Sequence, residues 1–302
     1  MNPTLGTPPA EVEIDARLVA ELIRAQHPDL AGLELGATPA ASGWDNVMYR
    51  LGPDLAVRLP RRMLGARSLV VEQRWLPRLA PSLPVDTPVP VRVGTPACGY
   101  PWPWSIVTWI PGAPASETPL HRDEAAQWGR FLGALHAIDT PDVPPENPYR
   151  GHGLAARDAA FRERLARLER DPAFRSGEQE ALSSAWNAGL ESPVETDACW
   201  VHGDLHPRNV VTVQGRLSGV IDWGDATVAD PSVDLSSAWM LFEPAEHGRV
   251  WDAYGRATPA RLARARAWAA YFAVVLIDAG RIDDSGFESL GRTIADRLKA
   301  SA

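Results

Sequence analysis

The chain has 302 residues, of which 45% are apolar and 23% are charged, and its formal net charge is −8. This composition is typical of a globular protein with a packed core, and the length allows one large domain or two lobes. The negative charge argues against a nucleic-acid partner, because binding to phosphates needs a basic face, whereas a cationic small molecule is compatible with it.

The sequence shows no sign of a membrane span, a secretion signal or a disulfide. The longest apolar run, at 267–277, is too short to cross a bilayer and predicts a buried helix. Residues 1–15 contain neither a basic cluster nor an apolar signal core, so we expect a cytoplasmic protein without a membrane partner. Cys98 and Cys199 lack metal-binding spacing and are interpreted as small buried residues. No feature of the sequence fixes an oligomeric state.

The first part of the chain combines one amphipathic helix with several strand signals. Ile14, Leu18 and Leu22 follow helical spacing, and His27 and Pro28 end that pattern. Two short runs around the turn "GPD" then predict a β-hairpin, which a helix and a buried strand follow. In chain order, these elements are predicted at 11–26, 46–51 with 55–60, 68–79 and 104–110.

The segment "PGAP" at 111–114 breaks the chain, and we place a boundary between two lobes there. Residues 1–110 then form a β-rich lobe and residues 111–302 a mostly helical lobe, which makes the fold class α+β. The helical signals of the second lobe run from Trp128 to Leu135, within 155–190 and within 233–298. The exception is a second hairpin, in which "NVVTV" and "LSGVIDW" flank the turn "QGR".

Three polar residues surround this second hairpin. Asp204 and Asn209 are five residues apart in one loop, and Asp222 comes at the end of the returning strand. The hairpin would bring Asn209 and Asp222 together as oxygen ligands of the kind that Mg²⁺ prefers beside substrate phosphates. Asp204 would then be free to orient a hydroxyl or accept its proton. Such a division of roles is typical of phosphoryl transfer.

The motif "HGDLHPRN", followed by "IDWGD", resembles the aminoglycoside phosphotransferase family of antibiotic and small-molecule kinases, relatives of the protein kinases. "SGWDNVMYRLG", "LAVRLP", "YPWPWSIVTWIPG" and "DPSVDLSSAW" also resemble members of this family, in the expected order. The resemblance covers most of residues 11–242. It implies a two-lobed protein-kinase-like fold with Asp204 as the catalytic residue. It also implies Mg²⁺ held by Asn209 and Asp222, and ATP or GTP as the phosphoryl donor.

The resemblance places the loop that covers the phosphates at the hairpin turn "AASGWDNV", between residues 40 and 47. The sequence has no Walker A motif and no G-x-G-x-x-G, so another loop must cover the phosphates. Ser42, Gly43 and Asn46 suit a tight turn that offers backbone N–H groups to phosphate. An ordinary surface hairpin is the alternative.

Arg58 occupies the position of the family's phosphate-binding lysine, and Glu72 is the expected ion-pair partner. The substitution fits a chain in which Lys299 is the only lysine among 30 basic residues. It still matters, because a planar guanidinium does not seat phosphates as an ammonium does. A solvated strand arginine is the alternative interpretation of Arg58.

By the same resemblance, the purine lies against the strand that links the lobes. Val107 would back the base, and the backbone of Trp109 and Ile110 would supply a hydrogen-bond donor and acceptor. Backbone recognition leaves no side-chain signal, so ATP and GTP both stay open. We interpret Trp102, Trp104 and Trp109 as packing residues.

Four polar residues near the motif have structural interpretations. His202 and His206 are expected to be buried and satisfied by backbone groups, and Asp230 and Asp234 to cap or brace the following helix.

The resemblance implies a small hydroxylated acceptor, with an aminoglycoside antibiotic first and a macrolide or another metabolite as the alternative. Four acids are candidate contacts to a polyamine acceptor, namely Asp225, Asp278, Asp283 and Asp284, and solvated helix acids are the favoured interpretation of the last three. A protein kinase would need a longer segment after Asp222. A binding-only pseudokinase would usually lack one of the catalytic or metal residues, and all three are present. The Arg58 substitution is the only feature that argues for this alternative.

Overall fold

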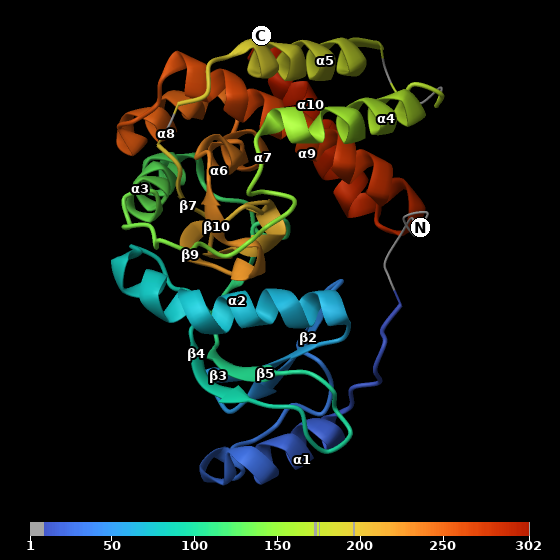
Figure 1. The fold of residues 1–302 in the computed structure, drawn as a ribbon, viewed down its shortest axis with the longest axis vertical. Helices are drawn as coiled ribbons and strands as arrows, with labels where there is room; N and C mark the ends of the chain where they lie inside the picture. The colour runs from blue at the N-terminus through green and yellow to red at the C-terminus, as the bar shows by residue number, and fades with distance from the viewer. Residues whose placement is uncertain (1–8, 172–173, 175, 196, 302) are drawn as a thin grey trace.

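The computed structural model describes residues 9–171, 174, 176–195 and 197–301. A β-rich N-terminal part and a helical C-terminal part lie one above the other along the long axis of the molecule (Figure 1). The predicted α+β class with this division of strands and helices is confirmed.

The N-terminal part is built on one antiparallel sheet with the strand order β1-β2-β3-β5-β4. Its strands are β1 (Ala41–Ser42), β2 (Asn46–Leu51), β3 (Leu55–Pro60), β4 (Pro90–Gly94) and β5 (Trp104–Thr108). The predicted first hairpin is confirmed, since β2 and β3 pair in register from Asn46 opposite Pro60 to Leu51 opposite Leu55. Gly52 opens the turn with a φ of +63°, a conformation that favours glycine.

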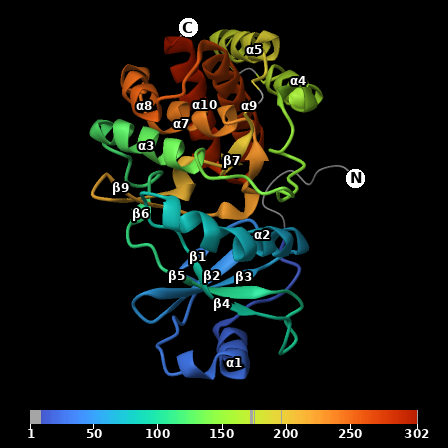
Figure 2. The same ribbon diagram turned by 60° about the vertical axis from the view of Figure 1, so that its left-hand side comes forward.

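Two helices flank this sheet, α1 (Ala16–Gln26) on one face and α2 (Met63–Leu79) on the other (Figure 2). α1 begins later than the predicted residue 11, because the Asp15 carboxylate caps it by accepting a hydrogen bond of 2.8 Å from the Leu18 N–H. α2 begins five residues before the predicted residue 68. Its first turn carries the exposed Met63 and Leu64, which supply no amphipathic signal.

α2 contributes to two hydrophobic cores and so joins the parts of the molecule. Ala66 packs in the core of the sheet, whereas Trp75, Leu76 and Leu79 pack in the core of the helical part. The rings of Trp75 and Trp200 are 5.1 Å apart at their centroids. The sheet and the helical part are therefore held together by buried apolar contacts along one helix.

The helical part is arranged around the long helix α9, against which α4, α5, α6 and α10 pack (Figure 1). The apolar run 267–277 lies in α9 and is mostly buried, as predicted. In the described part of the chain, no helix has the length and apolarity needed to cross a membrane. The helices are α3 (Ala125–Leu135), α4 (Asp158–Leu168), α5 (Ser176–Glu191), α6 (Ser232–Leu235), α7 (Ser237–Leu241), α8 (His247–Tyr254), α9 (Pro259–Asp283) and α10 (Ser285–Ala300).

Two small antiparallel sheets lie between α9 and the N-terminal part. β6 pairs with β8 and β8 with β9, while β7 pairs with β10. Their strands are β6 (Ala113–Pro114), β7 (Cys199–Val201), β8 (Val210–Val213), β9 (Arg216–Val220) and β10 (Thr227–Ala229).

Cys199 is buried as expected, but Cys98 is exposed, so the prediction for that cysteine is wrong. Ala97 and Tyr100 exchange two backbone hydrogen bonds of 3.1 and 2.8 Å, which places Cys98 at the tip of a tight turn. A turn tip faces solvent whatever its residue type, and the sequence contained no signal for this pairing.

The loop after β9 passes directly against α2. A Cβ added at Gly224 would lie 2.6 Å from the Cβ of Ser68, an approach that only glycine permits. The contact sets the distance between α2 and the end of β9.

We expect Gly224→Ala to lower the free energy of unfolding by about 1–3 kcal/mol, because α2 or the loop must move to make room for the methyl group. Urea denaturation measures the change. Gly248→Ala in α8 is the matched control, since a Cβ there meets no atom within 4 Å and the stability should be unchanged or raised. Wild-type stability of Gly224→Ala would contradict the close approach.

Candidate active site

The β8–β9 hairpin brings the two ends of the second motif together. Val210 pairs with Val220, and the Ile221 N–H donates to the Asn209 carbonyl at 2.9 Å. Gln214 and Gly215 form the turn with φ values of 50° and 75°. The predicted hairpin is thus present, and Asn209 lies beside the residue that precedes Asp222.

The fully buried carboxylate of Asp234 holds the loop that carries Asp204. Asp234 accepts hydrogen bonds from the His202 and Gly203 N–H groups at 2.7 and 2.8 Å, and His136 Nε2 lies 3.3 Å from the same carboxylate. The interpretation of Asp234 as a brace of its own helix is therefore wrong, because the side chain points away from that helix to the loop. Asp230 does cap the helix, through a bond of 2.9 Å from the Ser232 N–H.

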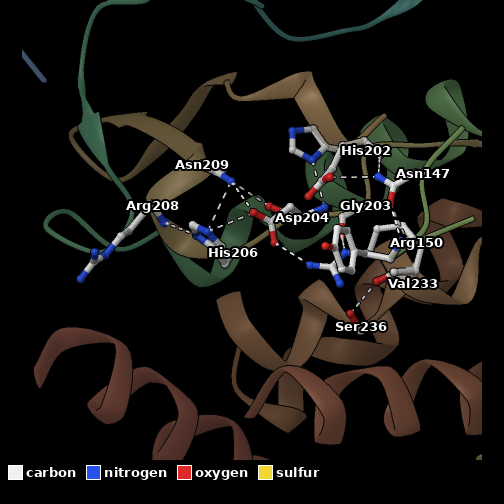
Figure 3. Close-up of polar contacts among 12 residues, drawn as sticks. Asn147, Arg150, His202, Gly203, Asp204, His206, Arg208, Asn209, Val233 and Ser236 are labelled. Atoms are coloured by element: carbon white, nitrogen blue, oxygen red, sulfur yellow. Dashed lines mark hydrogen bonds and ion pairs between the residues drawn. The ribbon is translucent and has the colours of Figure 1, made fainter. Parts of the chain in front are cut away.

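The Asp204 carboxylate is flanked on both sides by nitrogen atoms (Figure 3). His206 Nε2 lies 3.4 Å from Oδ2, and Arg150 Nη2 lies 3.4 Å from Oδ1. Burial raises the pKa of Asp204, but the neighbouring His206, Arg150 and His202 together lower this pKa more, to well below its usual range. The carboxylate is therefore ionised at neutral pH.

The two histidines of the motif differ in what they contact. His202 is fully buried; its Nδ1 accepts the Asp204 N–H at 3.2 Å and its Nε2 donates to the Ile221 carbonyl at 3.0 Å. The structural interpretation of His202 is confirmed. His206 Nδ1 accepts the Arg208 N–H at 3.2 Å, but Nε2 faces Asp204, so backbone groups satisfy only half of the ring.

Asp222 sits at the entrance to the next turn in a left-handed conformation, with φ 63° and ψ 65°. Arg58 Nη2 lies 2.7 Å from its Oδ1 and 3.1 Å from Glu72 Oε1. Arg58 is only 4% exposed and Glu72 only 2%, whereas the Asp222 side chain is 49% exposed. The expected ion pair with Glu72 is present, and the alternative of a solvated strand arginine is wrong.

Glu72 also ties α2 to the turn that follows Asp222. Burial raises the pKa of Glu72 to about 7, while Arg58 and hydrogen bonds from the backbone N–H groups of Trp223 and Gly224 lower it. One side chain of α2 thus contacts both the buried guanidinium and the turn.

A pocket with an empty volume of ≈ 600 Å³ opens where these segments meet. It is lined by Asp45, Asn46, Leu64, Ser68, Tyr149, Asp204, Asp222, Gly224 and Asp225. Four of these side chains are carboxylates, and none is lysine or arginine. Such a pocket favours cations.

Asn209 and Asp222 fit a hard divalent cation. The Asn209 Nδ2 group donates to the Asp204 carbonyl at 2.9 Å, which leaves Oδ1 as the ligand atom of the amide. Asp222 has Oδ2 in addition to the Oδ1 that Arg58 contacts. Among the described residues, no three or more His, Cys, Asp or Glu side chains form a metal site. One carboxylate and one amide oxygen beside substrate phosphates are the ligands that suit Mg²⁺.

The hairpin expected to cover phosphates ends at this pocket. The Gly43 N–H donates to the Asn46 carbonyl at 2.9 Å, and the Asn46 Oδ1 is buried without a hydrogen-bond partner in the described part of the chain. Arg61 donates to the Gly43 carbonyl at 3.0 Å, and Arg62 pairs with Asp45 at 2.9 Å. The Ser42 backbone pairs with β2, while its side chain lies outside the described residues.

The residues expected to contact the purine lie at the end of β5 and directly after it. Val107 is 1% exposed and pairs with β3, and the Trp109 N–H donates to the Asp54 carbonyl at 2.8 Å. Within the described residues, the Ile110 N–H has no backbone or side-chain acceptor. Trp109 can therefore offer its carbonyl and Ile110 its N–H. Trp102 and Trp104 are buried packing residues, as predicted.

Asp225 lines the pocket. The Asn147 side-chain amide donates to the backbone carbonyl and to the Oδ1 of Asp225, both at 2.9 Å. Burial raises the pKa of Asp225; Arg150 lowers it and Asp204 raises it. The structure thus brings Asp225, the candidate contact to a cationic acceptor, to the pocket.

The acids of α9 and α10 do not behave as solvated side chains. Asp278 pairs with Arg164 and Arg167 at 2.8 and 2.6 Å, and Asp284 makes two contacts of 2.6 Å with Arg208. The solvated interpretation of these two acids is therefore wrong, because arginines from other segments reach them. The Asp283 side chain lies outside the described residues.

The sequence did not point to three residues that the structure brings to the site, namely Asn147, Tyr149 and Arg150. They lie in the Pro-rich loop after α3, more than 50 residues before the motif, and belong to no pattern that indicates chemistry. Asp45, which also lines the pocket, differs from these three because it lies in "SGWDNVMYRLG", one of the segments that carry the family resemblance.

Comparison with curated proteins finds relatives at low identity. An uncharacterized protein of Bacillus subtilis, YcbJ, is 27% identical over 225 residues, which cover 68% of this chain and 69% of that protein. Viomycin phosphotransferase of Streptomyces vinaceus is 29% identical over 164 residues. That match covers 49% of this chain and 53% of the relative, which is less than two thirds of its length.

Solved structures with the same fold cover nearly the whole chain. The GDP complex of aminoglycoside 2'-phosphotransferase-IIIa matches with a TM-score of 0.70 at 21% identity, over 95% of this chain and 99% of that chain. The model of the phosphotransferase enzyme family matches residues 36–269, which include the sheet, the pocket and the first part of α9. The chain therefore belongs to the phosphotransferase enzyme family and has its kinase-like fold.

Proposed function

We propose that this protein transfers the γ-phosphoryl group of ATP or GTP to a hydroxyl group of a small molecule, with an aminoglycoside-type antibiotic as the favoured acceptor. A macrolide or another hydroxylated metabolite is the alternative acceptor. The cytoplasmic location and the exclusion of nucleic acid stay predictions from the sequence.

The observation that carries the proposal is the position of Asp204 in the pocket. Its ionised carboxylate lines the same wall as Asp222, and Asn209 binds the Asp204 carbonyl. Phosphoryl transfer needs an attacking hydroxyl aligned with the phosphorus, and it needs the charge on the phosphate oxygens neutralised. Asp204 supplies the first requirement, and a Mg²⁺ ion held by Asn209 and Asp222 would meet the second.

Asp204 acts in the proposed reaction by orientation and by late proton acceptance. The acceptor hydroxyl donates its hydrogen bond to the carboxylate, which aims an oxygen lone pair at the phosphorus. The transition state is loose, so the hydroxyl proton moves to the carboxylate late and a strong base is not required. Because the Asp204 pKa is depressed, alignment contributes more than basicity.

Asn209 and Asp222 would hold Mg²⁺, which neutralises charge on the phosphate oxygens when it is bound. Arg58 fixes the Asp222 carboxylate from the side away from solvent. The loop from Ser42 to Asn46 would cover the phosphates, and Val107, Trp109 and Ile110 would contact the purine.

The four pocket carboxylates favour a cationic acceptor. The exposed side chains of Leu64 and Tyr149 border the same pocket and offer apolar surface. Aminosugar antibiotics carry both hydroxyl and ammonium groups, so they fit the charge of the pocket. Relatives that are named for their substrates include viomycin and aminoglycoside phosphotransferases.

Incubation with ATP or GTP, Mg²⁺ and a panel of kanamycin, gentamicin, viomycin and erythromycin tests the proposal, with mass spectrometry to detect an added phosphate. Phosphorylation of an aminoglycoside is expected. Erythromycin as the only product would favour the macrolide alternative. Nucleotide binding without turnover of any acceptor would favour a binding-only pseudokinase.

We expect Asp204→Asn to lower kcat by about 10² or more, the usual scale for the loss of a positioned acid or base. The amide keeps the size of the side chain and one acceptor oxygen, so the acceptor KM should change little. Nucleotide affinity, measured by calorimetry, should be unchanged. A wild-type kcat would make Asp204 a structural loop residue.

Asp222→Ala should abolish transfer and weaken nucleotide binding only when Mg²⁺ is present, because the variant lacks a ligand of the metal but no contact to the base. A Mg²⁺ titration of nucleotide affinity in wild type and variant measures this. Equal affinities across the whole titration would argue against the metal assignment.

Arg58→Ala should raise the nucleotide KM and lower kcat, because Asp222 and the buried Glu72 lose their shared counter-charge. Arg58→Lys keeps the charge and should retain part of the activity. Steady-state kinetics with varied nucleotide measures both variants. Full activity of Arg58→Ala would remove this residue from the site and point to Arg61 or Arg62.

A further inference from the structure

Arg150 reaches the catalytic loop from the Pro-rich loop after α3, and its side chain has no role in the function proposed above. Its Nε donates to the Gly203 carbonyl at 2.6 Å, and its Nη2 lies 3.4 Å from Asp204 Oδ1. Its guanidinium also lies over the Phe272 ring of α9, 4.7 Å from the ring centre. Its own loop, the catalytic loop and α9 thus meet at one side chain.

The backbone of Arg150 is fixed as firmly as its side chain. The Asn147 side chain accepts the N–H groups of Tyr149 and Arg150 at 2.8 and 2.9 Å, and its amide donates to Asp225. The Thr227 hydroxyl donates to the Pro145 carbonyl at 2.7 Å. The loop is therefore bonded to the segment that follows Asp222.

Gly203 and Arg150 are matched in shape. Gly203 has a φ of 85°, and a Cβ there would lie 3.0 Å from the Arg150 Cγ. The arginine stem fills the space that a larger residue at position 203 would occupy. This close approach lets the guanidinium reach both the Gly203 carbonyl and the Asp204 carboxylate.

Arg150 does not contact the acceptor from this position. Its side chain is 14% exposed and is absent from the residues that line the pocket. The groups that its guanidinium contacts are the Gly203 carbonyl and the Asp204 carboxylate, so its charge acts on the catalytic loop itself. Arg150 also lies near Asp225, whose carboxylate would otherwise face Asp204 without a counter-charge between them.

We propose that Arg150 is a positioning residue for the phosphoryl transfer, which holds the Asp204 carboxylate in the orientation that receives the acceptor hydroxyl. The inference rests on the proposed role of Asp204. With Oδ1 facing Arg150 and Oδ2 facing His206, rotation of the carboxylate about its Cβ–Cγ bond breaks both contacts. Contacts at both oxygens therefore hold the carboxylate in one orientation at the pocket, and a fixed orientation is what the alignment of a hydroxyl needs.

The test is a double-mutant cycle between Arg150→Met and Asp204→Asn, with kanamycin as the probe acceptor. Methionine keeps an apolar stem over Phe272 and removes the charge and the donors. Arg150→Met alone should lower kcat by about tenfold or more, with an unchanged calorimetric affinity for nucleotide. In the Asp204→Asn background the same change should lower kcat by less than about twofold. Arg150→Lys should recover part of the loss in the wild-type background.

A structural readout makes the test independent of the acceptor. The crystal structure of Arg150→Met should show the Asp204 carboxylate rotated away from its position between Arg150 and His206. Arg157→Met is the matched control, because Arg157 donates to the Pro148 carbonyl of the same loop at 2.7 Å and does not touch Asp204. Its kcat should be within about twofold of the wild type.

The outcomes separate this inference from the proposed function. Equal losses from Arg150→Met in both backgrounds, an unmoved Asp204 carboxylate, or an equal loss in Arg157→Met would each overturn the positioning role. A wild-type kcat of Asp204→Asn would instead overturn the catalytic assignment of Asp204, and with it the basis of the inference. Absence of any kanamycin product, together with an unmoved carboxylate, would also overturn the positioning role.

Discussion

The site depends on one buried guanidinium. A single nitrogen of Arg58 contacts Glu72 of α2 and Asp222 of the loop after β9, so one charge joins the sheet, the helix and that loop. A buried ion pair contributes little stability by itself, but the loss of one partner leaves a charge that is costly to bury. The three residues therefore have to stay together, and this requirement fixes the distance from α2 to the pocket.

The close approach of Gly224 to Ser68 and the bonds from Trp223 and Gly224 to Glu72 serve the same arrangement. α2 can hold the turn only because no side chain at position 224 separates them. The apolar contacts of Trp75 with the helical part anchor the other half of α2. Packing thus sets the position of the helix, and polar contacts at its first half set the orientation of Asp222.

The sequence was sufficient where the signal was local. The hairpin β2–β3 and the buried helix around 267–277 follow from alternation, turn residues and apolar runs, and the structure has both. The ion pair of Arg58 with Glu72 was predicted from the family resemblance. The residues themselves give no pairing signal, because fourteen positions separate them and one lies on a strand and the other on a helix. Arg150 could not be predicted in this way, because its contacts depend on how a Pro-rich loop docks against a segment more than 50 residues away. The Cys98 and Asp278 predictions failed for the same reason: exposure and partners were set by tertiary contacts that leave no periodic pattern.

The distribution of charge links nucleotide binding to cation binding. The pocket is lined by four carboxylates, while Arg58 and Arg150 lie behind it and are already engaged by Asp222 and Asp204. A triphosphate is a polyanion, so it would meet net repulsion in this pocket if it came alone. In the proposed enzyme, a divalent cation held by Asn209 and Asp222 would reverse the sign of the charge where the phosphates would lie. In the proposed enzyme the arginines therefore hold the carboxylates in place, and the metal supplies the attraction for the nucleotide.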